Sequence, residues 1–194
     1  MSMRVDLAAI ADAIAPGARV LDIGCGDGTL LANLRDTKQV DARGMEIDGD
    51  CVERCVAQGL SVVQGDANRD LADYPDKGFD YTVLSQTLQT ATRPDEMLDQ
   101  LLRVGRQAFV SFPNFAHWRT RSALMFGGRM PVTRAIPVSW YETPNIHHVT
   151  VKDFRELARE KGARIENEWF FAGGRRVGGT ANWRAEFAVF QLSR

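Results

Sequence analysis

Cysteine is scarce in this sequence of 194 residues, which contains only Cys25, Cys51 and Cys55. An odd number of cysteines in a chain without an export signal is typical of reduced thiols and argues against a disulfide-stapled scaffold. Cys51 and Cys55 are one helical turn apart, but two thiols without further cysteine or histidine nearby make a poor metal site. We therefore expect no bound metal.

The sequence also lacks a long apolar run and an excess of charge of either sign. No stretch approaches the roughly 20 apolar residues that a membrane-spanning helix needs. The N-terminal segment carries Asp6 and Asp12 in an amphipathic pattern, unlike the apolar core of a signal peptide. A formal net charge of -1 provides no overall attraction to nucleic acid or membranes. We expect a cytoplasmic protein that does not bind membranes.

What the sequence does contain is a regular alternation of strand-like and helix-like segments. The predicted strands cover 19–23, 42–47, 61–65, 79–85, 107–112, 163–171 and 186–192. The predicted helices cover 5–15, 28–36, 50–59, 93–105 and 151–162, the last opened by a Thr150 and Asp153 cap. This alternation predicts a single α/β domain over 1–194, with three layers, a mostly parallel sheet and helices on both faces.

The first predicted strand runs into a turn, 22–28, with glycine at three alternate positions. The dinucleotide pattern G-x-G-x-x-G would need its third glycine one residue later, and no Lys-Ser/Thr pair follows as in a P-loop. A turn stripped of side chains lets a ligand lie against the backbone of Gly24, Cys25 and Gly26. The Asp22 carboxylate is placed to contact a cationic or amino group of a ligand. S-adenosylmethionine is a ligand that carries such groups.

Polar residues also end the next three strands. Glu46 is placed to accept hydrogen bonds from both ribose hydroxyls, with Ile47 packing on the adenine. Asp66 can accept from the adenine amino group beside the backbone of Ala67, and Ser85 ends the fourth strand in the same region. Each acid alone would more often be a solvated turn residue. Together they predict S-adenosylmethionine or S-adenosylhomocysteine as the cofactor.

The stretches VLDIGCGDG, GMEID and QGDA resemble, in order, the cofactor motifs of the class I S-adenosylmethionine-dependent methyltransferases. The resemblance covers nearly the whole chain and implies that Rossmann-like fold. The polar-Pro-Pro-aromatic motif of many amine methyltransferases is absent, because the fourth strand ends in LSQTLQ. No general base stands out among His117, His147, His148 and Tyr141. The catalytic residues stay unassigned, and methyl transfer by the chain itself stays open.

Segment 113–150 interrupts the alternation after the fifth predicted strand and is rich in proline and aromatic residues. From FPNFAHWRTR to NIHHVTVKDF, it closely resembles the signature of the MetW family of methionine biosynthesis proteins. That resemblance implies a protein that binds and activates or regulates a homoserine O-acyltransferase of the MetX type. The alternative is a methyltransferase for a small metabolite, with the segment capping its pocket, or less favourably for RNA.

No acidic residue occurs between Asp99 and Glu142. The arginines in that interval are Arg103, Arg106, Arg119, Arg121, Arg129 and Arg134. Arginine and aromatic side chains are enriched at protein interfaces, although phosphate contacts and stacking on RNA would use the same types. We expect a surface for the acyltransferase, and disfavour nucleic acid. Its predicted residues are Trp118, Arg119, Arg121, Arg129 and Trp140.

Overall fold

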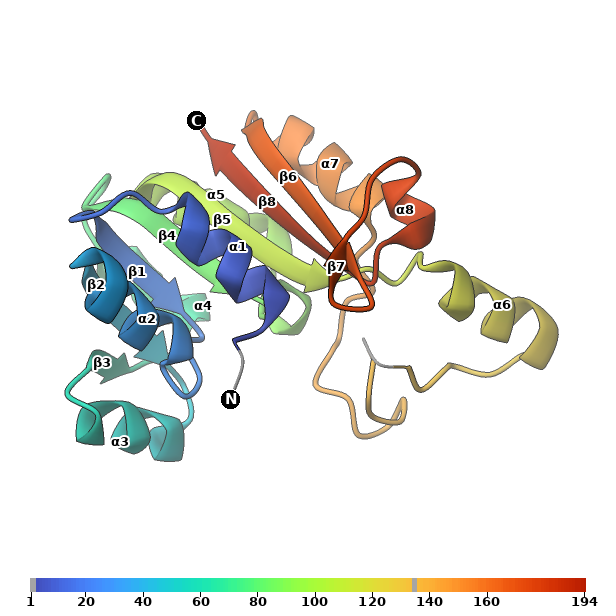
Figure 1. The fold of residues 1–194 in the computed structure, drawn as a ribbon, viewed down its shortest axis with the longest axis horizontal. Coiled ribbons are helices and arrows are strands. Elements are labelled where there is room, and N and C mark those ends of the chain that lie inside the picture. The colour runs from blue at the N-terminus through green and yellow to red at the C-terminus, as the bar shows by residue number, and fades with distance from the viewer. Residues whose placement is uncertain (1–2, 134–135) are drawn as a thin grey trace.

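One sheet runs through the whole structure. A computed structural model describes residues 3–133 and 136–194. Its strands form a single eight-stranded sheet in the order β3-β2-β1-β4-β5-β8-β6-β7 (Figure 1). The five strands from β3 to β5 are parallel, and β8, β6 and β7 are antiparallel additions. The predicted α/β class with a mostly parallel sheet is confirmed.

The longer elements lie close to the ranges expected from the sequence. In chain order the first half consists of α1 (Val5–Ala13), β1 (Arg19–Ile23), α2 (Thr29–Lys38), β2 (Asp41–Glu46), α3 (Gly49–Ala57), β3 (Ser61–Gln64), α4 (Ala67–Asp70), η1 (Leu71–Asp73) and β4 (Phe79–Ser85). The second half consists of η2 (Leu88–Thr90), α5 (Pro94–Val104), β5 (Gly105–Pro113), α6 (Trp118–Gly127), α7 (Val151–Glu160), β6 (Arg164–Ala172), β7 (Arg175–Arg176), α8 (Ala181–Arg184) and β8 (Phe187–Ser193).

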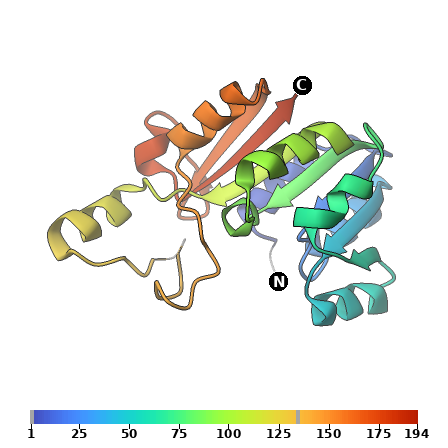
Figure 2. The same ribbon diagram turned by 180° about the vertical axis from the view of Figure 1, so that it is seen from behind.

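Helices cover both faces of the sheet, as Figures 1 and 2 show from opposite sides. Because successive strand residues point to opposite faces, Val20 of β1 joins a core with α1 and α2, whereas Leu21 joins a core with α5 and α7. A smaller cluster places Cys25 and Cys55 side by side beneath α3. None of the helices in the described ranges is long and apolar enough to cross a membrane.

The first helix is shorter than expected. It ends at Ala13, two residues before the predicted Ala15, and Ile14 is already extended. The residue before a proline is pushed out of the helical region by the proline ring, so Ala15 cannot continue a helix into Pro16. At the predicted cap of α7, Thr150 Oγ1 accepts a hydrogen bond from the Asp153 amide at 3.2 Å, which confirms that cap.

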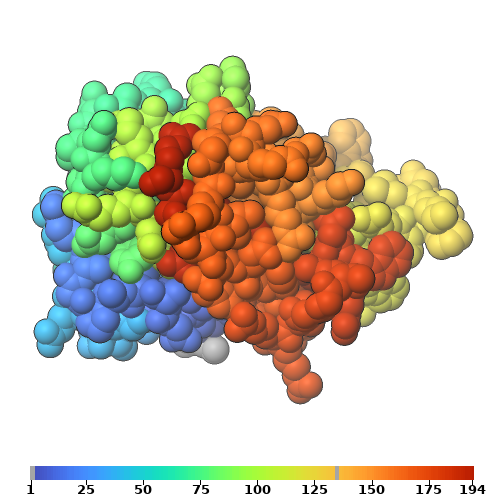
Figure 3. Space-filling model, turned by 90° about the horizontal axis from the view of Figure 1, so that it is seen from above, coloured from blue at the N-terminus to red at the C-terminus, as the bar shows by residue number. Residues whose placement is uncertain are grey.

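Residues 114–150 are here called the arm, and its described parts, 114–133 and 136–150, project from the end of the sheet between β5 and α7 (Figures 1 and 3). The sequence predicted no helix there, yet α6 forms its outward half. Only Thr120 of α6 is buried, so the helix has no apolar face on the core and lacks the periodicity that reveals a helix. Arg134, one of the arginines noted above, lies outside the described residues.

One buried asparagine, Asn114, holds the base of the arm together through hydrogen bonds, an arrangement here called the clasp. Its Oδ1 accepts hydrogen bonds from the amides of Ala116 at 3.2 Å and Val151 at 3.3 Å, one at each end of the arm. Its Nδ2 donates to the carbonyls of Asn182 and Ala185, next to β8. Both ends of the arm are thereby fixed to the same point of the sheet.

Phe154 should be a stability determinant of the sheet face under α7. Its ring lies 4.9 Å from that of Phe112 and 4.6 Å from that of Phe190, and it is fully buried. We expect Phe154→Ala to lower the free energy of unfolding by about 3–5 kcal/mol, because it leaves a cavity and removes aromatic contacts. Urea unfolding followed by circular dichroism measures this.

Lys152→Ala is the matched control, because this side chain is exposed on the same helix. It should change the free energy of unfolding by less than about 0.5 kcal/mol. Equal effects of the two substitutions would show that the aromatic cluster does not stabilise the sheet.

Candidate functional site

The order of the strands reverses between β1 and β4. The chain builds outward from β1 through β2 and β3 on one side, and through β4 and β5 on the other. Connections therefore leave β1 and β4 in opposite directions, which opens a crevice at their carboxyl ends. The register pairs Ile23 with Leu84, so the glycine turn after β1 lies beside the end of β4.

The glycine turn needs glycine for two different reasons. Gly24, Gly26 and Gly28 have φ angles of +71°, +56° and +76°, in the left-handed region that side chains disfavour. At Gly24 there is also no space, because an added Cβ would lie 2.6 Å from Thr87 Oγ1. At Gly26 an added Cβ would meet nothing within 4 Å, so the turn is open there.

The amides of the turn are bound to β2. Gly24 and Cys25 donate to the Met45 carbonyl at 2.8 and 3.3 Å, and Gly26 donates to Glu46 Oε2 at 2.8 Å. This differs from the expected row of amides open to a ligand. The turn therefore presents glycine Cα surface to the crevice, and its amides serve to hold its shape.

Glu46 is the centre of this arrangement. Besides Gly26, its carboxylate accepts from the amides of Ile47 at 2.8 Å and Asp48 at 3.1 Å. A carboxylate offers about four acceptor positions, so three amides leave capacity for a further donor. The next side chain, Ile47, is 65% exposed and offers an apolar surface beside the carboxylate.

A cavity of about 340 Å³ lies over these strand ends. Five of the predicted cofactor residues line it, namely Gly24, Glu46, Ile47, Asp66 and Ala67. The remaining lining residues come from the ends of β1 and β2, from α4 and the residue before Asp66, from η2 and its flanking residues, and from α5. Sequence reasoning did not find them: Ile23, Met45, Gly65, Asn68, Thr87, Thr90, Ala91 and Met97. Its volume is within the range of small-molecule sites, and its wall combines apolar groups with carboxylates.

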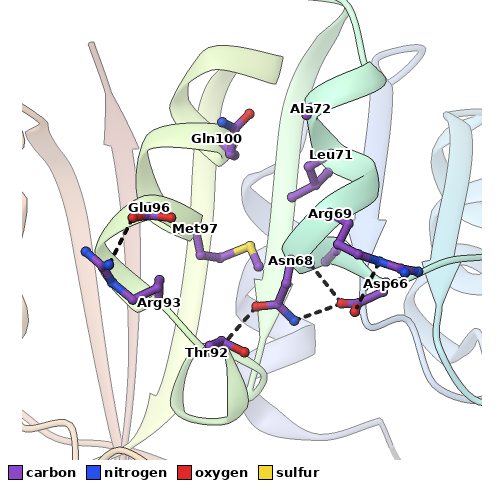
Figure 4. Close-up of a pocket in the computed structure, with 11 residues that line it drawn as sticks. Asp66, Asn68, Arg69, Leu71, Ala72, Thr92, Arg93, Glu96, Met97 and Gln100 are labelled. Atoms are coloured by element: carbon purple, nitrogen blue, oxygen red, sulfur yellow. Dashed lines mark hydrogen bonds and ion pairs between the residues drawn. The ribbon is translucent and has the colours of Figure 1, made fainter.

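Asp66 is held in place at the start of α4. Its Oδ1 accepts from the Asn68 amide at 3.0 Å and side chain at 2.8 Å, which lowers the pKa of the carboxyl group. Figure 4 shows a neighbouring cavity of about 460 Å³, which shares Asp66, Ala67, Asn68 and Met97 with the first. Asn68 also accepts from the Thr92 amide at 3.1 Å and so joins the β3 and β4 loops.

Asp22 and Cys25 are buried and do not line the cavity. Asp22 is buried, and its Oδ1 has no hydrogen-bond partner in the described part of the chain. Burial raises the pKa of Asp22 to about 7; the charge of Arg4 lowers it and that of Glu46 raises it. The Cys25 thiol packs with Cys55, and burial raises its pKa.

Ser85 belongs to a network that the sequence did not reveal. Its hydroxyl donates to Asp6 Oδ2 at 3.1 Å and accepts from Arg4 Nη2 at 2.6 Å. Ser111 of β5 donates to the same Asp6 oxygen at 2.9 Å. Burial opposes ionisation of Asp6, but the Arg4 charge and these hydrogen bonds outweigh it and lower the pKa. The network fastens α1 to the carboxyl ends of β4 and β5.

A family model described as the methionine biosynthesis protein MetW matches residues 4–192. The chain belongs to the MetW family. A bifunctional methionine biosynthesis protein MetXA/MetW of Rhodopirellula baltica is 33% identical over 207 residues, which cover 100% of this MetW chain and 33% of that protein. A 2-ketoarginine methyltransferase of Streptomyces arginensis is 31% identical over 178 residues, which cover 80% of this chain and 49% of that protein. The chain spans between a third and a half of the length of these relatives.

The MetW chain has the fold of S-adenosylmethionine-dependent methyltransferases. One such protein from Archaeoglobus fulgidus superposes with a TM-score of 0.73 at 16% identity, over 97% of this chain and 91% of that one. The structure titled [4+2]-cyclase SpnF gives a TM-score of 0.69 at 16% identity, over 98% of this chain and 80% of that one. Because the same fold includes a cyclase, the fold of a MetW protein does not by itself specify methyl transfer.

The predicted partner residues of the MetW chain spread along the arm. Trp118 is partly exposed with Arg119 stacked 5.3 Å over its ring, and Trp140 is exposed in the irregular part of the arm that leads back to α7. Arg129 is exposed just after α6. Arg121 is also exposed, but its Nε donates to the Ala116 carbonyl at 2.6 Å and its guanidinium lies 5.3 Å over the Trp183 ring. The tip of α6 adds exposed Leu124, Met125 and Phe126, which sequence reasoning missed because no periodicity marks them.

The candidate general bases of the arm do not gather at one point. His117 begins α6, where its Nδ1 accepts from the Arg119 amide at 3.4 Å. His148 packs edge-on against Phe115 at 4.6 Å, and exposed Tyr141 packs against Trp140. Within 3–133 and 136–194, no three histidine, cysteine or acidic residues form a metal-binding group.

Asp22 should make the stability of the MetW chain depend on pH. Because the pKa of about 7 in the folded chain exceeds the ordinary 3.8, the folded state holds a proton that the unfolded state loses. Stability is therefore lost as the pH rises from about 4 to about 7. The free energy of unfolding of Asp22→Asn, relative to wild type, should rise on the order of 4 kcal/mol across this window.

Urea unfolding at intervals between pH 4 and pH 8 tests this expectation. Asp12→Asn is the control, because Asp12 is exposed on α1 and its substitution should leave the profile parallel to wild type. A profile of Asp22→Asn that is also parallel to wild type would contradict the raised pKa of Asp22.

Proposed function

We propose that this MetW protein binds S-adenosylmethionine or S-adenosylhomocysteine at the crevice and uses its arm to bind and regulate a MetX-type homoserine O-acyltransferase. The observation that carries the first part is the cavity that joins Gly24, Glu46, Ile47 and Asp66 at three successive strand ends. The second part is supported by the exposed arm and by the relative that bears both names, MetXA and MetW. The single sheet formed by the described strands supports treating residues 1–194 as one domain.

Each part of the proposed cofactor can be matched to a residue that lines the crevice. The free acceptor capacity of Glu46 suits a ribose hydroxyl, and exposed Ile47 suits the adenine face. Asp66, ionised and beside Ala67, suits the adenine amino group. Gly24 lines the cavity together with Thr87 and brings no side chain into it, which suits the thioether region.

Glu46→Ala should weaken S-adenosylhomocysteine binding by at least about tenfold, because hydrogen bonds to a charged group contribute roughly 1.5–3 kcal/mol. Isothermal titration calorimetry measures the affinity. Glu46→Gln should also lose affinity, because its amide nitrogen donates where the carboxylate oxygen accepts.

Glu53→Ala is the matched control on exposed α3 and should bind as wild type does. Thermal unfolding of each variant checks that the turn is still folded. Unchanged affinity in folded Glu46→Ala would remove Glu46 from the ribose role.

The arm suits an apolar partner surface with acidic groups. Met125 is 75% exposed and Phe126 is 83% exposed at the tip of α6. Clusters of exposed aromatic and apolar side chains mark interaction sites on soluble proteins. The charged side chains of the arm before Glu142 are all arginines, with no acid among them. A partner that fits this surface presents apolar side chains ringed by carboxylates.

The crevice and the arm meet at η2. The Gln89 carbonyl accepts from the amides of Ile146 and His147 of the arm, each at 3.0 Å. Thr87 and Thr90, on either side of Gln89, line the cofactor cavity. A ligand that contacts these threonines can therefore alter how the arm is held, which supports regulation of the partner by cofactor level.

Phe126→Asp and Arg119→Glu should each weaken acyltransferase binding by at least tenfold, since central apolar and arginine contacts carry about 2 kcal/mol or more. A MetX-type homoserine O-acyltransferase is titrated into each variant, and homoserine acylation is measured in the same samples. Val56→Asp is the control, because Val56 is also apolar and exposed, but lies on α3, away from the arm.

Wild-type binding by both arm variants would contradict the arm as the contact surface. Repeating the titration with saturating S-adenosylhomocysteine measures coupling, which must be reciprocal and typically amounts to about 1–3 kcal/mol. Equal affinities with and without ligand would refute regulation by the cofactor.

A small-metabolite methyltransferase is the second candidate function. It is favoured by the similarity to a protein named 2-ketoarginine methyltransferase, and by the crevice itself. Consumption of S-adenosylmethionine with a small acceptor, in the absence of any acyltransferase, would establish that function in place of the regulatory one.

A further inference from the structure

A second cavity, here called the hairpin cavity, lies where the base of the arm meets the β6–β7 hairpin. It is bounded by the start of α6 on one side and by the hairpin and the end of α8 on the other (Figure 1). Its volume is about 520 Å³, which is within the range of small-molecule sites. It shares no lining residue with the cofactor cavity and is therefore a site separate from the crevice.

Glu186 supplies a fixed carboxylate to the hairpin cavity. The residue is only 9% exposed, and its Oε2 accepts a hydrogen bond from the Gly173 amide at 2.8 Å. Its backbone is hydrogen-bonded to Asn114 and Phe171, which fixes the point from which the side chain extends. A carboxylate offers about four acceptor positions, and in the described part of the chain only the Gly173 amide uses one. Glu186 can therefore accept further donors from a ligand.

His117 supplies a fixed donor to the same cavity. The residue is 6% exposed, and its Nδ1 accepts a hydrogen bond from the Arg119 amide at 3.4 Å. Burial lowers the pKa of His117; the charge of Glu186 raises it and that of Arg119 lowers it. The ring is therefore neutral near pH 7, and its proton lies on Nε2 because Nδ1 is an acceptor. Within 3–133 and 136–194, that Nε2 N–H has no hydrogen-bond acceptor.

Arg119 and Arg184 add positive charge to the lining of the cavity. Both side chains are exposed, and Arg119 is held 5.3 Å over the Trp118 ring. Most arginines of this chain form an ion pair with a nearby carboxylate. Neither of these two forms one with a described residue, Glu186 included. The cavity therefore presents opposite charges that do not neutralise each other.

We propose that the hairpin cavity binds a free α-amino acid, with the ammonium group on Glu186 and the carboxylate on His117 and the two arginines. A simple anion would be repelled by the Glu186 carboxylate, and a simple amine would be repelled by the arginines. A zwitterion satisfies both ends of the site. The rest of the wall includes Trp118 and Val177, so the amino acid that fits carries an apolar side chain.

Calorimetry on the full chain tests this proposal with L-leucine, L-methionine and L-phenylalanine, which share the α-amino-acid group and differ in the apolar side chain. At least one of them should bind saturably. Two analogues of the tightest binder then remove one charge each, the N-acetyl form removing the ammonium group and the carboxamide removing the carboxylate. Each analogue should bind at least about tenfold more weakly, because a hydrogen bond between charged groups is lost.

Variants assign the binding to the hairpin cavity. Glu186→Gln keeps an oxygen for the Gly173 amide but loses the charge, so it should bind the amino acid at least about tenfold more weakly. Its affinity for the N-acetyl analogue, which has no ammonium group, should not fall. Arg184→Ala should weaken both of these ligands, because both carry the carboxylate. Arg175→Ala is the control, because Arg175 is an exposed arginine of the same hairpin that does not line the cavity.

Thermal unfolding of each variant checks that the hairpin is folded. The proposal is wrong if none of the three amino acids binds, if the analogues bind as tightly as the amino acid, or if folded Glu186→Gln binds it as wild type does. S-Adenosylhomocysteine binding by the same preparations tests the proposed function separately, because Glu186 does not line the cofactor cavity.

Discussion

The attachment of the glycine turn to the end of β2 is the constraint on which the crevice depends. Glu46 binds the Gly26 amide, and the Met45 carbonyl binds the two amides before it. The turn is therefore ordered by its neighbouring strand before any ligand is present. Preorganisation of this kind lowers the conformational entropy that binding must otherwise offset. It also explains how a turn with three left-handed residues keeps one shape.

Much of the fold could be read from the sequence because the central strands are covered on both faces. β1 and β4 have the predicted bounds, since strands of this kind appear as continuous apolar runs between turns. α6 could not be read in the same way. Its residues pack on no neighbouring layer, so no repeating apolar pattern distinguishes that helix from an irregular loop.

The residues of the candidate site also divide into those that the sequence could predict and those that it could not. Glu46 and Asp66 could be grouped from the sequence, because parallel topology alone brings the carboxyl ends of neighbouring strands together, whereas Asp22 does not line the cavity. Arg4 could not, because 81 residues separate it from Ser85 and the contact depends on the path of α1 across the sheet. The hydrogen bonding of the turn amides to β2 could not be predicted from the sequence either, since it depends on the direction in which the Glu46 side chain points.

The clasp formed by Asn114 has a consequence for how this chain can change over evolutionary time. Because both ends of the arm are hydrogen-bonded to one side chain, the arm is a closed loop whose two ends have fixed positions on the sheet. The entropy of closing such a loop grows only with the logarithm of its length, by about 0.6 kcal/mol for each doubling. The arm can therefore be lengthened, shortened or changed in sequence at little cost to the sheet, while the crevice at the strand ends keeps its residues.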